Sequence, residues 1–194
     1  MSRFRRRILA KVLQVIPSDW TFEWDASKGD LKDNGFTVSG NNGYGGGYTL
    51  TSEGQLFTVN NSQNVTVATH TNSNEKITLL STFNASLLSN LGIQIAVSDG
   101  NTSTTFQIVN DSNGYHLDIQ TGQWTFTSVG LPEAMVLNKD FEVQFERESS
   151  GAVKVYFNNI ACYDGPSYDT GYKDTLIRVR YNSTVLLKSL KLKY

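Results

Sequence analysis

The sequence predicts an all-β fold in which two antiparallel sheets pack into a sandwich, preceded by a short basic arm. Short runs of alternating apolar and polar residues recur along most of the chain, as in strands that bury one face. Turn residues separate these runs every about 8 to 12 residues, the spacing typical of sandwiches. No segment of helical length follows the arm, and no repeat of fixed period indicates a propeller or a solenoid. The 194 residues suffice for one β domain.

The composition limits the classes of function. A formal net charge of −1 argues against a protein whose whole surface binds nucleic acid. Only 18% of the residues are charged, while glycine, asparagine, serine and threonine supply turns and solvent-facing strand positions. No apolar run approaches the about 18 residues of a membrane-spanning helix, so we expect no membrane span. The single cysteine, Cys162, excludes an internal disulfide and is expected to be a small buried hydrophobe.

Residues 1–16 are expected to form a separate basic N-terminal arm that is retained in the protein. Apolar residues from position 8 to position 16 recur at helical spacing, which favours a short amphipathic helix that docks on a partner or on another copy of the chain. A first strand or a frayed arm is the alternative. Pro17 begins the sandwich domain, which spans residues 17–194. The residues expected to anchor the arm are Arg3, Phe4, Arg5, Arg6, Arg7, Ile8 and Leu9.

The first strands follow the arm directly. Trp20, Phe22 and Trp24 alternate with polar residues and predict a strand with an aromatic core face. A polar, turn-like segment follows at residues 25–35, and the glycine-rich residues 41–47 are expected to form a loop. Further strands are predicted at residues 36–39, 48–50, 55–59, 65–69 and 76–83.

The middle of the chain predicts a meander of antiparallel strands. The segment from Ala85 to Asn90 is compatible with one helical turn before it. Asp99-Gly100 between two alternating runs is a strong hairpin signal. Thr121-Gly122 predicts a turn immediately before the last strand of the meander. The four strands are predicted at residues 92–97, 104–109, 115–120 and 123–127.

The hairpin from Phe141 to Phe157 is the clearest element of the sequence. Its two halves alternate Phe and Val with charged or polar residues, and Ser149-Ser150-Gly151 supplies the turn. We expect Glu146 or Glu148 to face Lys154 across the strands, a pair that contributes about 0.2–1 kcal/mol. After this hairpin the sequence predicts a polar loop at 163–174 and two closing strands at 176–181 and 185–192.

Residues 18–194 resemble the concanavalin A-like lectin/glucanase superfamily, especially its laminin-G-like jelly rolls. Four features carry the resemblance in order: the aromatic strand 20–24, the strand 77–83, the hairpin 141–157 running into Asn158-Asn159-Ile160, and the closing strand that ends in 187–192. The resemblance implies a jelly-roll sandwich. It does not imply a function, because this fold carries many.

The first nine residues, Met-Ser-Arg-Phe-Arg-Arg-Arg-Ile-Leu, resemble the start of small structural proteins of tailed phages of gut bacteria, crAss-like phages among them. This resemblance implies a virion component without enzymatic activity, such as a head fibre, a head decoration or a tail accessory protein. The arm would bind capsid or tail proteins, and the sandwich would face outward from the virion. Because such components follow local symmetry, a homo-oligomer is expected. This is the main functional hypothesis from the sequence.

Carbohydrate binding is the alternative hypothesis. Tyrosines lie in or beside the glycine-rich loops, and exposed aromatic rings stack on the faces of sugars. The competing interpretation is that these rings pack at sheet edges with their hydroxyls in water. A host-surface glycan would then be the partner. The tyrosines expected to contact it are Tyr44, Tyr48, Tyr168 and Tyr172.

The sequence offers no convincing catalytic or cofactor site. Glu142 and Glu146 resemble the paired acids of glucanases, but Gln144 replaces the middle acid, and the pair would lie roughly 13 Å apart along a regular strand. Retaining glycosidases need about 5–5.5 Å; Glu146 and Glu148, roughly 6.6 Å apart, leave only inversion open. We therefore expect no catalytic residues and no enzyme.

Metal binding has similarly little support in the sequence. Calcium is the one cation considered, since loop carboxylates of laminin-G-like domains often bind it. Asp25, Asp30 and Asp33 would supply the oxygen ligands, although their spacing does not match an EF-hand. His70 and His116 stand at no recognisable triad or metal spacing. No cofactor is expected.

Overall fold

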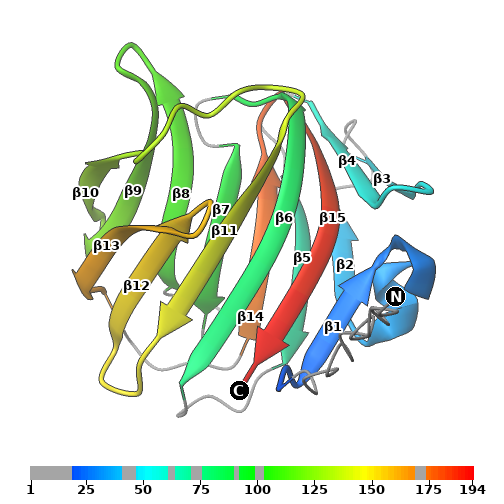
Figure 1. The fold of residues 1–194 in the computed structure, drawn as a ribbon, viewed down its shortest axis with the longest axis horizontal. Coiled ribbons are helices and arrows are strands. Elements are labelled where there is room, and N and C mark those ends of the chain that lie inside the picture. Colours follow the sequence, from blue (N-terminus) through cyan, green and yellow to red (C-terminus); the bar gives the residue numbers. More distant parts are fainter. Residues whose placement is uncertain are drawn as a thin grey trace, which may run out of the picture.

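The structure is a computed structural model that describes residues 19–40, 47–60, 64–70, 76–89, 92–98, 103–168 and 174–194. These residues form a sandwich of two antiparallel sheets, which confirms the predicted fold class (Figure 1). The only described helices are two short 3-10 helices, η1 (Ala26–Lys28) and η2 (Leu31–Asn34). Within the described ranges, no helix has the length and apolarity needed to span a membrane. The predicted arm lies outside these ranges.

Sheet A forms the nearer layer of the sandwich in Figure 1. Its described strands are β1 (Phe22–Asp25), β3 (Gly47–Leu50), β4 (Gln55–Val59), β6 (Ile77–Leu87), β11 (Asp140–Arg147), β12 (Ala152–Phe157), β13 (Ile160–Pro166) and β15 (Ser183–Lys193). They follow the order β13-β12-β11-β6-β15-β4-β3, and β1 pairs with β15. The first and last described strands of the chain are therefore neighbours.

Sheet B forms the layer behind it. Its described strands are β2 (Thr37–Gly40), β5 (Asn64–His70), β7 (Ile93–Ser98), β8 (Ser103–Asp111), β9 (Gly114–Gly122), β10 (Thr125–Gly130) and β14 (Asp174–Arg180). They follow the order β10-β9-β8-β7-β14-β5-β2. The predicted meander thus forms one half of this sheet, with β10 at its edge.

The core lies between the sheets and is built from alternate residues of nearly every strand. Phe145 of β11 contacts Phe106 of β8 across the sandwich, with ring centroids 5.6 Å apart, and both rings are fully buried. Within sheet A, Phe141 stacks at 5.7 Å on both Phe83 and Phe157. Burying each such side chain contributes about 1.5–3 kcal/mol, so these rings dominate the stability of the sandwich.

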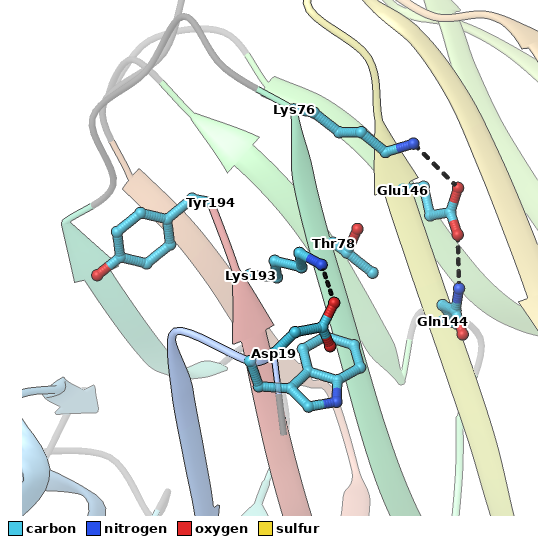
Figure 2. Close-up of a pocket in the computed structure, with 8 residues that line it drawn as sticks. Asp19, Lys76, Thr78, Gln144, Glu146, Lys193 and Tyr194 are labelled. Carbon is cyan, nitrogen blue, oxygen red and sulfur yellow. Dashed lines mark hydrogen bonds and ion pairs between the residues drawn. The ribbon is translucent and has the colours of Figure 1, made fainter. Parts of the chain in front are cut away.

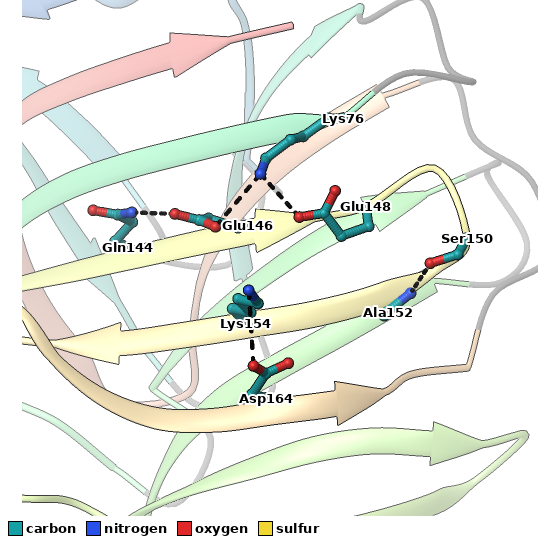
Figure 3. Close-up of polar contacts among 8 residues, drawn as sticks. All are labelled: Lys76, Gln144, Glu146, Glu148, Ser150, Ala152, Lys154 and Asp164. Atoms are coloured by element: carbon teal, nitrogen blue, oxygen red, sulfur yellow. Dashed lines mark hydrogen bonds and ion pairs between the residues drawn. The ribbon is translucent and has the colours of Figure 1, made fainter.

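The predicted hairpin 141–157 is confirmed as β11 and β12. Its turn places Gly151 at φ +86°, a conformation that glycine adopts without strain, and Glu148 N–H donates to the Ala152 carbonyl at 2.8 Å. Glu146 lies opposite Lys154 in the register, as expected. Lys154 Nζ lies 3.8 Å from an Asp164 carboxylate oxygen on β13, and its charge adds to the hydrogen bond from Lys76 in lowering the pKa of Glu148 (Figure 3).

Two predicted irregular segments are strands. The helical turn considered at 85–90 is wrong, since β6 continues through Ala85, which is fully buried and keeps the period of two, to Leu87. The predicted loop 163–174 is wrong over its first part, because β13 extends to Pro166 by pairing with β12. Both errors arise where strand pairing, which the local sequence does not encode, overrides weak local preference.

The turn predicted at Thr121-Gly122 is wrong by two residues. Strand β9 continues through Gly122, which pairs with Thr125, so Gln123 and Trp124 form the turn to β10. Trp124 has φ +84° there, a conformation that favours glycine or asparagine. Gly122 therefore lies two residues before Trp124, the residue whose backbone conformation favours glycine.

Candidate functional site

A recess of about 500 Å³ opens on the outer face of sheet A (Figure 2). Its volume lies within the about 300–1,000 Å³ of ligand sites in proteins. The two ends of the sandwich domain contribute half of its lining, and strands β6 and β11 contribute most of the rest. The lining residues are Asp19, Trp20, Lys76, Thr78, Gln144, Glu146, Lys193 and Tyr194.

Strand register brings the floor of the recess together. Thr78 of β6 lies opposite Glu146 of β11 on one side and Lys193 of β15 on the other. The neighbours of these residues along each strand, such as Ile77 and Leu192, are buried in the core. Because side chains alternate along a strand, the three residues form a row across the outer face.

Ion pairs organise one side of the recess. Lys76 Nζ lies 2.9 Å from Glu148 Oε1 and 3.9 Å from Glu146 Oε2, and Gln144 Nε2 donates to Glu146 Oε1 at 2.6 Å (Figures 2 and 3). The hydrogen bond to Glu148 raises the pKa of Lys76 and lowers the pKa of the Glu148 carboxyl. Lys76 and Glu148 therefore hold each other in their charged forms.

Another ion pair forms the opposite side. Lys193 donates to the carboxylate of Asp19, and this hydrogen bond lowers the pKa of Asp19 (Figure 2). The lining side chains then carry two negative charges, from Asp19 and Glu146, and two positive charges, from Lys76 and Lys193. Their sum is zero, so the recess offers donors and acceptors without favouring an ion of either sign.

Aromatic side chains complete the recess. Trp20 is half-buried, and Tyr194 is 43% exposed. The sequence pattern places Trp20 on the core face of a strand, which is wrong, since β1 begins at Phe22 and Trp20 lines the recess. No sequence signal marks the site as a whole, because its residues come from four separate segments that only the fold brings together.

The tyrosines predicted as glycan contacts do not meet at this recess. Tyr48 on β3 packs half-buried against the core at one edge of sheet A. Tyr168 follows β13 at the other edge, and its backbone N–H donates to the Gln120 carbonyl of β9 at 2.9 Å. These two tyrosines therefore belong to different sites. Tyr44, Tyr172 and the anchoring residues from Arg3 to Leu9 lie outside the described residues, and their roles stay predictions.

The acidic residues considered for calcium serve local structure instead. Asp25 accepts a hydrogen bond from Ser27 N–H at 2.9 Å and caps η1, and Asp30 accepts one from Lys32 N–H at 3.1 Å and caps η2. Among the residues that the structure describes, no group of three or more His, Cys, Asp or Glu could hold a metal ion.

The paired glutamates do not have the environment of catalytic acids. Glu146 and Glu148 share the ammonium group of Lys76, which lowers the pKa of Glu148 through a hydrogen bond. A general acid in glycoside hydrolysis needs a raised pKa instead. Lys76 instead favours the charged form of Glu148.

No protein-family model matches the chain, and none of the curated proteins matches it significantly in sequence. Solved structures match the sandwich. The metal-free carbohydrate recognition domain of Emp46p has a TM-score of 0.62 and 10% identity, over 85% of this chain and 91% of that chain. The carbohydrate-binding module CBM66 from Bacillus subtilis has a TM-score of 0.58 and 13% identity, over 82% and 96%. Both are jelly-roll, lectin-like domains.

Two further structures place the fold in other contexts. The carbohydrate esterase vb_24B_21 of the Shiga toxin-encoding bacteriophage phi24B has a TM-score of 0.63 and 14% identity, over 89% of this chain and 97% of that chain. A sialidase has a TM-score of 0.68 and 11% identity over 90% of this chain, which spans only 18% of the sialidase. At these identities the matches establish the jelly-roll fold, which is the fold that the resemblance of residues 18–194 implies.

Proposed function

We propose that the sandwich domain binds carbohydrate and does not catalyse a reaction on it. The observation that carries the proposal is the recess on sheet A, in which aromatic rings stand beside balanced hydrogen-bonding groups. The names of the matching domains, a carbohydrate recognition domain and a carbohydrate-binding module, support it at the level of the fold. Among the hypotheses from the sequence, this one has more support than a virion role.

The chemistry of the recess matches that of a neutral sugar. A pyranose ring presents a face of C–H groups, which packs on aromatic rings such as those of Trp20 and Tyr194. Its hydroxyls both donate and accept hydrogen bonds. Gln144 and the two lysines supply donors, and the two carboxylates supply acceptors. Because these charges cancel, the recess offers an ionic ligand no net attraction to offset its larger loss of hydration, which favours an uncharged saccharide.

A glycan array followed by calorimetric titration tests the proposal. We expect the full chain to bind neutral saccharides and Tyr194→Ala to weaken binding about 3- to 10-fold, because one stacking ring is lost. Leu87→Ala is the matched control, since Leu87 is 51% exposed on sheet A but does not line the recess. A folded protein that binds no saccharide would overturn the proposal. Unchanged affinity in both Tyr194→Ala and Gln144→Ala would exclude the recess as the site.

A virion role is a second proposal, compatible with the first. It rests on the sequence of the first nine residues, and the phage-derived esterase of nearly matching length shows that the same fold occurs in a phage protein. In this proposal residues 1–16 attach the domain to capsid or tail proteins, and the sandwich meets a host-surface glycan. Quantitative mass spectrometry of purified particles should find a symmetric copy number that deletion of residues 1–16 abolishes. Absence of the full chain from particles would contradict this role.

A further inference from the structure

The tip of the β9–β10 hairpin carries a tryptophan that the fold does not use. Trp124 is 86% exposed, and its side chain makes no hydrogen bond or ring contact with the described residues. The other exposed hydrophobic side chains of the described chain are at most 51% exposed. Single exposed apolar side chains are common on protein surfaces, so the exposure of Trp124 counts only together with a second observation at the same residue.

The backbone conformation of Trp124 is the second observation that sets this residue apart. Its φ of +84° is the value that a type II turn requires at its third residue, where glycine or asparagine is favoured. Four of the other five described non-glycine residues with positive φ are asparagines, and the fifth, Tyr181, packs its ring against Arg180 at 4.6 Å. Trp124 has no such compensating contact. Glycine would satisfy this turn better, and an outlier of this kind supports the hypothesis that the indole has a role outside the fold.

The surroundings of Trp124 indicate a neutral, hydroxyl-bearing partner. Residues 119–130 contain no charged side chain, and their polar groups are threonine, serine and glutamine. Phe126, two residues further on, is 39% exposed and lies opposite Gln120 in the register. Without basic residues the tip has no charge to attract phosphate, nucleic acid or an anionic membrane surface. A ring with polar neutral neighbours suits the C–H face and hydroxyls of a neutral sugar.

We infer that Trp124 is a second saccharide contact, in which the indole stacks on the apolar face of a neutral hexopyranose. This inference rests on the proposed carbohydrate-binding function and adds a separate contact to it. The recess lies on the outer face of sheet A, whereas β10 is the edge strand of sheet B. Two separated contacts raise the affinity for a polysaccharide that carries many copies of the sugar far more than for a single short oligosaccharide.

The test measures binding of the full chain to an immobilised neutral polysaccharide from the array and to its soluble short oligosaccharide. Trp124→Ala should weaken polysaccharide binding at least about tenfold, as truncation of a tryptophan hot spot does, and Trp124→Tyr should retain most of it. Ile160→Ala is the control, because Ile160 is 45% exposed at another strand end. Trp124→Gly separates binding from folding: it should lose binding to the same extent while its melting temperature stays unchanged or rises.

Each other outcome has a defined meaning. If the wild type binds and both Trp124→Ala and Trp124→Gly bind equally well, the inference fails while the proposed function stands. If the wild type binds no saccharide, the proposed function is wrong, and the inference that rests on it falls with it. A lower melting temperature in Trp124→Gly would overturn the inference by making the indole structural. Size-exclusion chromatography in which Trp124→Ala dissociates an oligomer would overturn it in favour of self-association.

Discussion

Two hairpins of this molecule have almost the same backbone angle at their turns and different residues there. The β11–β12 hairpin places Gly151 at φ +86°, and the β9–β10 hairpin places Trp124 at φ +84°. The first turn carries the residue that its backbone favours. The second carries one of the residues least suited to it.

The side chains of the two hairpins also differ, in burial and in charge. The β11–β12 hairpin buries Phe145 and Val155 completely and holds its outer face with lysine–carboxylate pairs. The tip of the β9–β10 hairpin has no charged residue between positions 119 and 130 and leaves Phe126 exposed. The comparison shows that one hairpin buries its aromatic side chains in the core, while the tip of the other leaves Trp124 and Phe126 exposed to solvent.

The largest expected difference concerns the phenylalanines of the two hairpins. Phe145→Ala should lower the free energy of unfolding by about 3–5 kcal/mol, because it leaves a cavity against Phe106 in the core. Phe126→Ala should change it by no more than about 0.5 kcal/mol, as is usual for surface substitutions. Urea denaturation of both variants measures the two values. Comparable losses would show that the β9–β10 hairpin is as structural as the other.

Substitutions at the two turns should change the free energy of unfolding by smaller amounts and in opposite directions. Gly151→Ala should destabilise the protein by about 1–2 kcal/mol, since a side chain at this angle crowds the backbone. Trp124→Gly should leave the free energy of unfolding unchanged or raise it by up to about 1 kcal/mol. Glycine relieves the backbone strain at this turn, but its greater freedom in the unfolded chain offsets part of that gain. Thermal unfolding of both variants compares the signs. A loss at both turns would remove the distinction between them.

The smallest expected effect is a pH dependence of stability, which arises in the β11–β12 hairpin because only this hairpin carries the Lys76–Glu148 ion pair. The hydrogen bond from Lys76 lowers the pKa of Glu148 in the folded protein. The contribution of Glu148 to stability is therefore present above its ordinary pKa and is lost as the pH falls through the lower, folded value. NMR titration should show a depressed Glu148 pKa that returns toward normal in Lys76→Met. An unchanged Glu148 pKa in that variant would mean that the ion pair does not form in solution.

The local pattern of the sequence predicts the parts of the fold in which turn chemistry and alternation agree. The hairpin 141–157 is such a case, because Gly151 stands where the turn needs it and the apolar residues alternate on both sides. The β9–β10 turn was misplaced because Gly122 is the usual turn residue and tryptophan is not. Strand β13 was missed because its pairing with β12 defines it, not its own alternation.

The candidate sites could not be predicted in the same way. Asp19 and Lys193 meet only because β1 pairs with β15, a contact between the two ends of the chain. Single-sequence patterns reach a few residues along the chain and carry no information about such pairings. The exposure of Trp124 is equally invisible, since an aromatic residue within an alternating run predicts burial. The tyrosines of the sequence therefore suggest a carbohydrate ligand as a hypothesis, and the contacts proposed from the structure are other aromatic residues.

The pairing of the first described strand with the last has a consequence for how this domain can be combined with others. Thr21 Oγ1 donates to the Tyr194 carbonyl at 3.2 Å, so the backbone enters and leaves the sandwich at one place. Domains with adjacent ends can be inserted into a surface loop of a host protein without separating the two sides of that loop. Here the junction also borders the recess, through Asp19 and Tyr194. A host joined at either end would therefore lie beside the recess and could contribute to its wall.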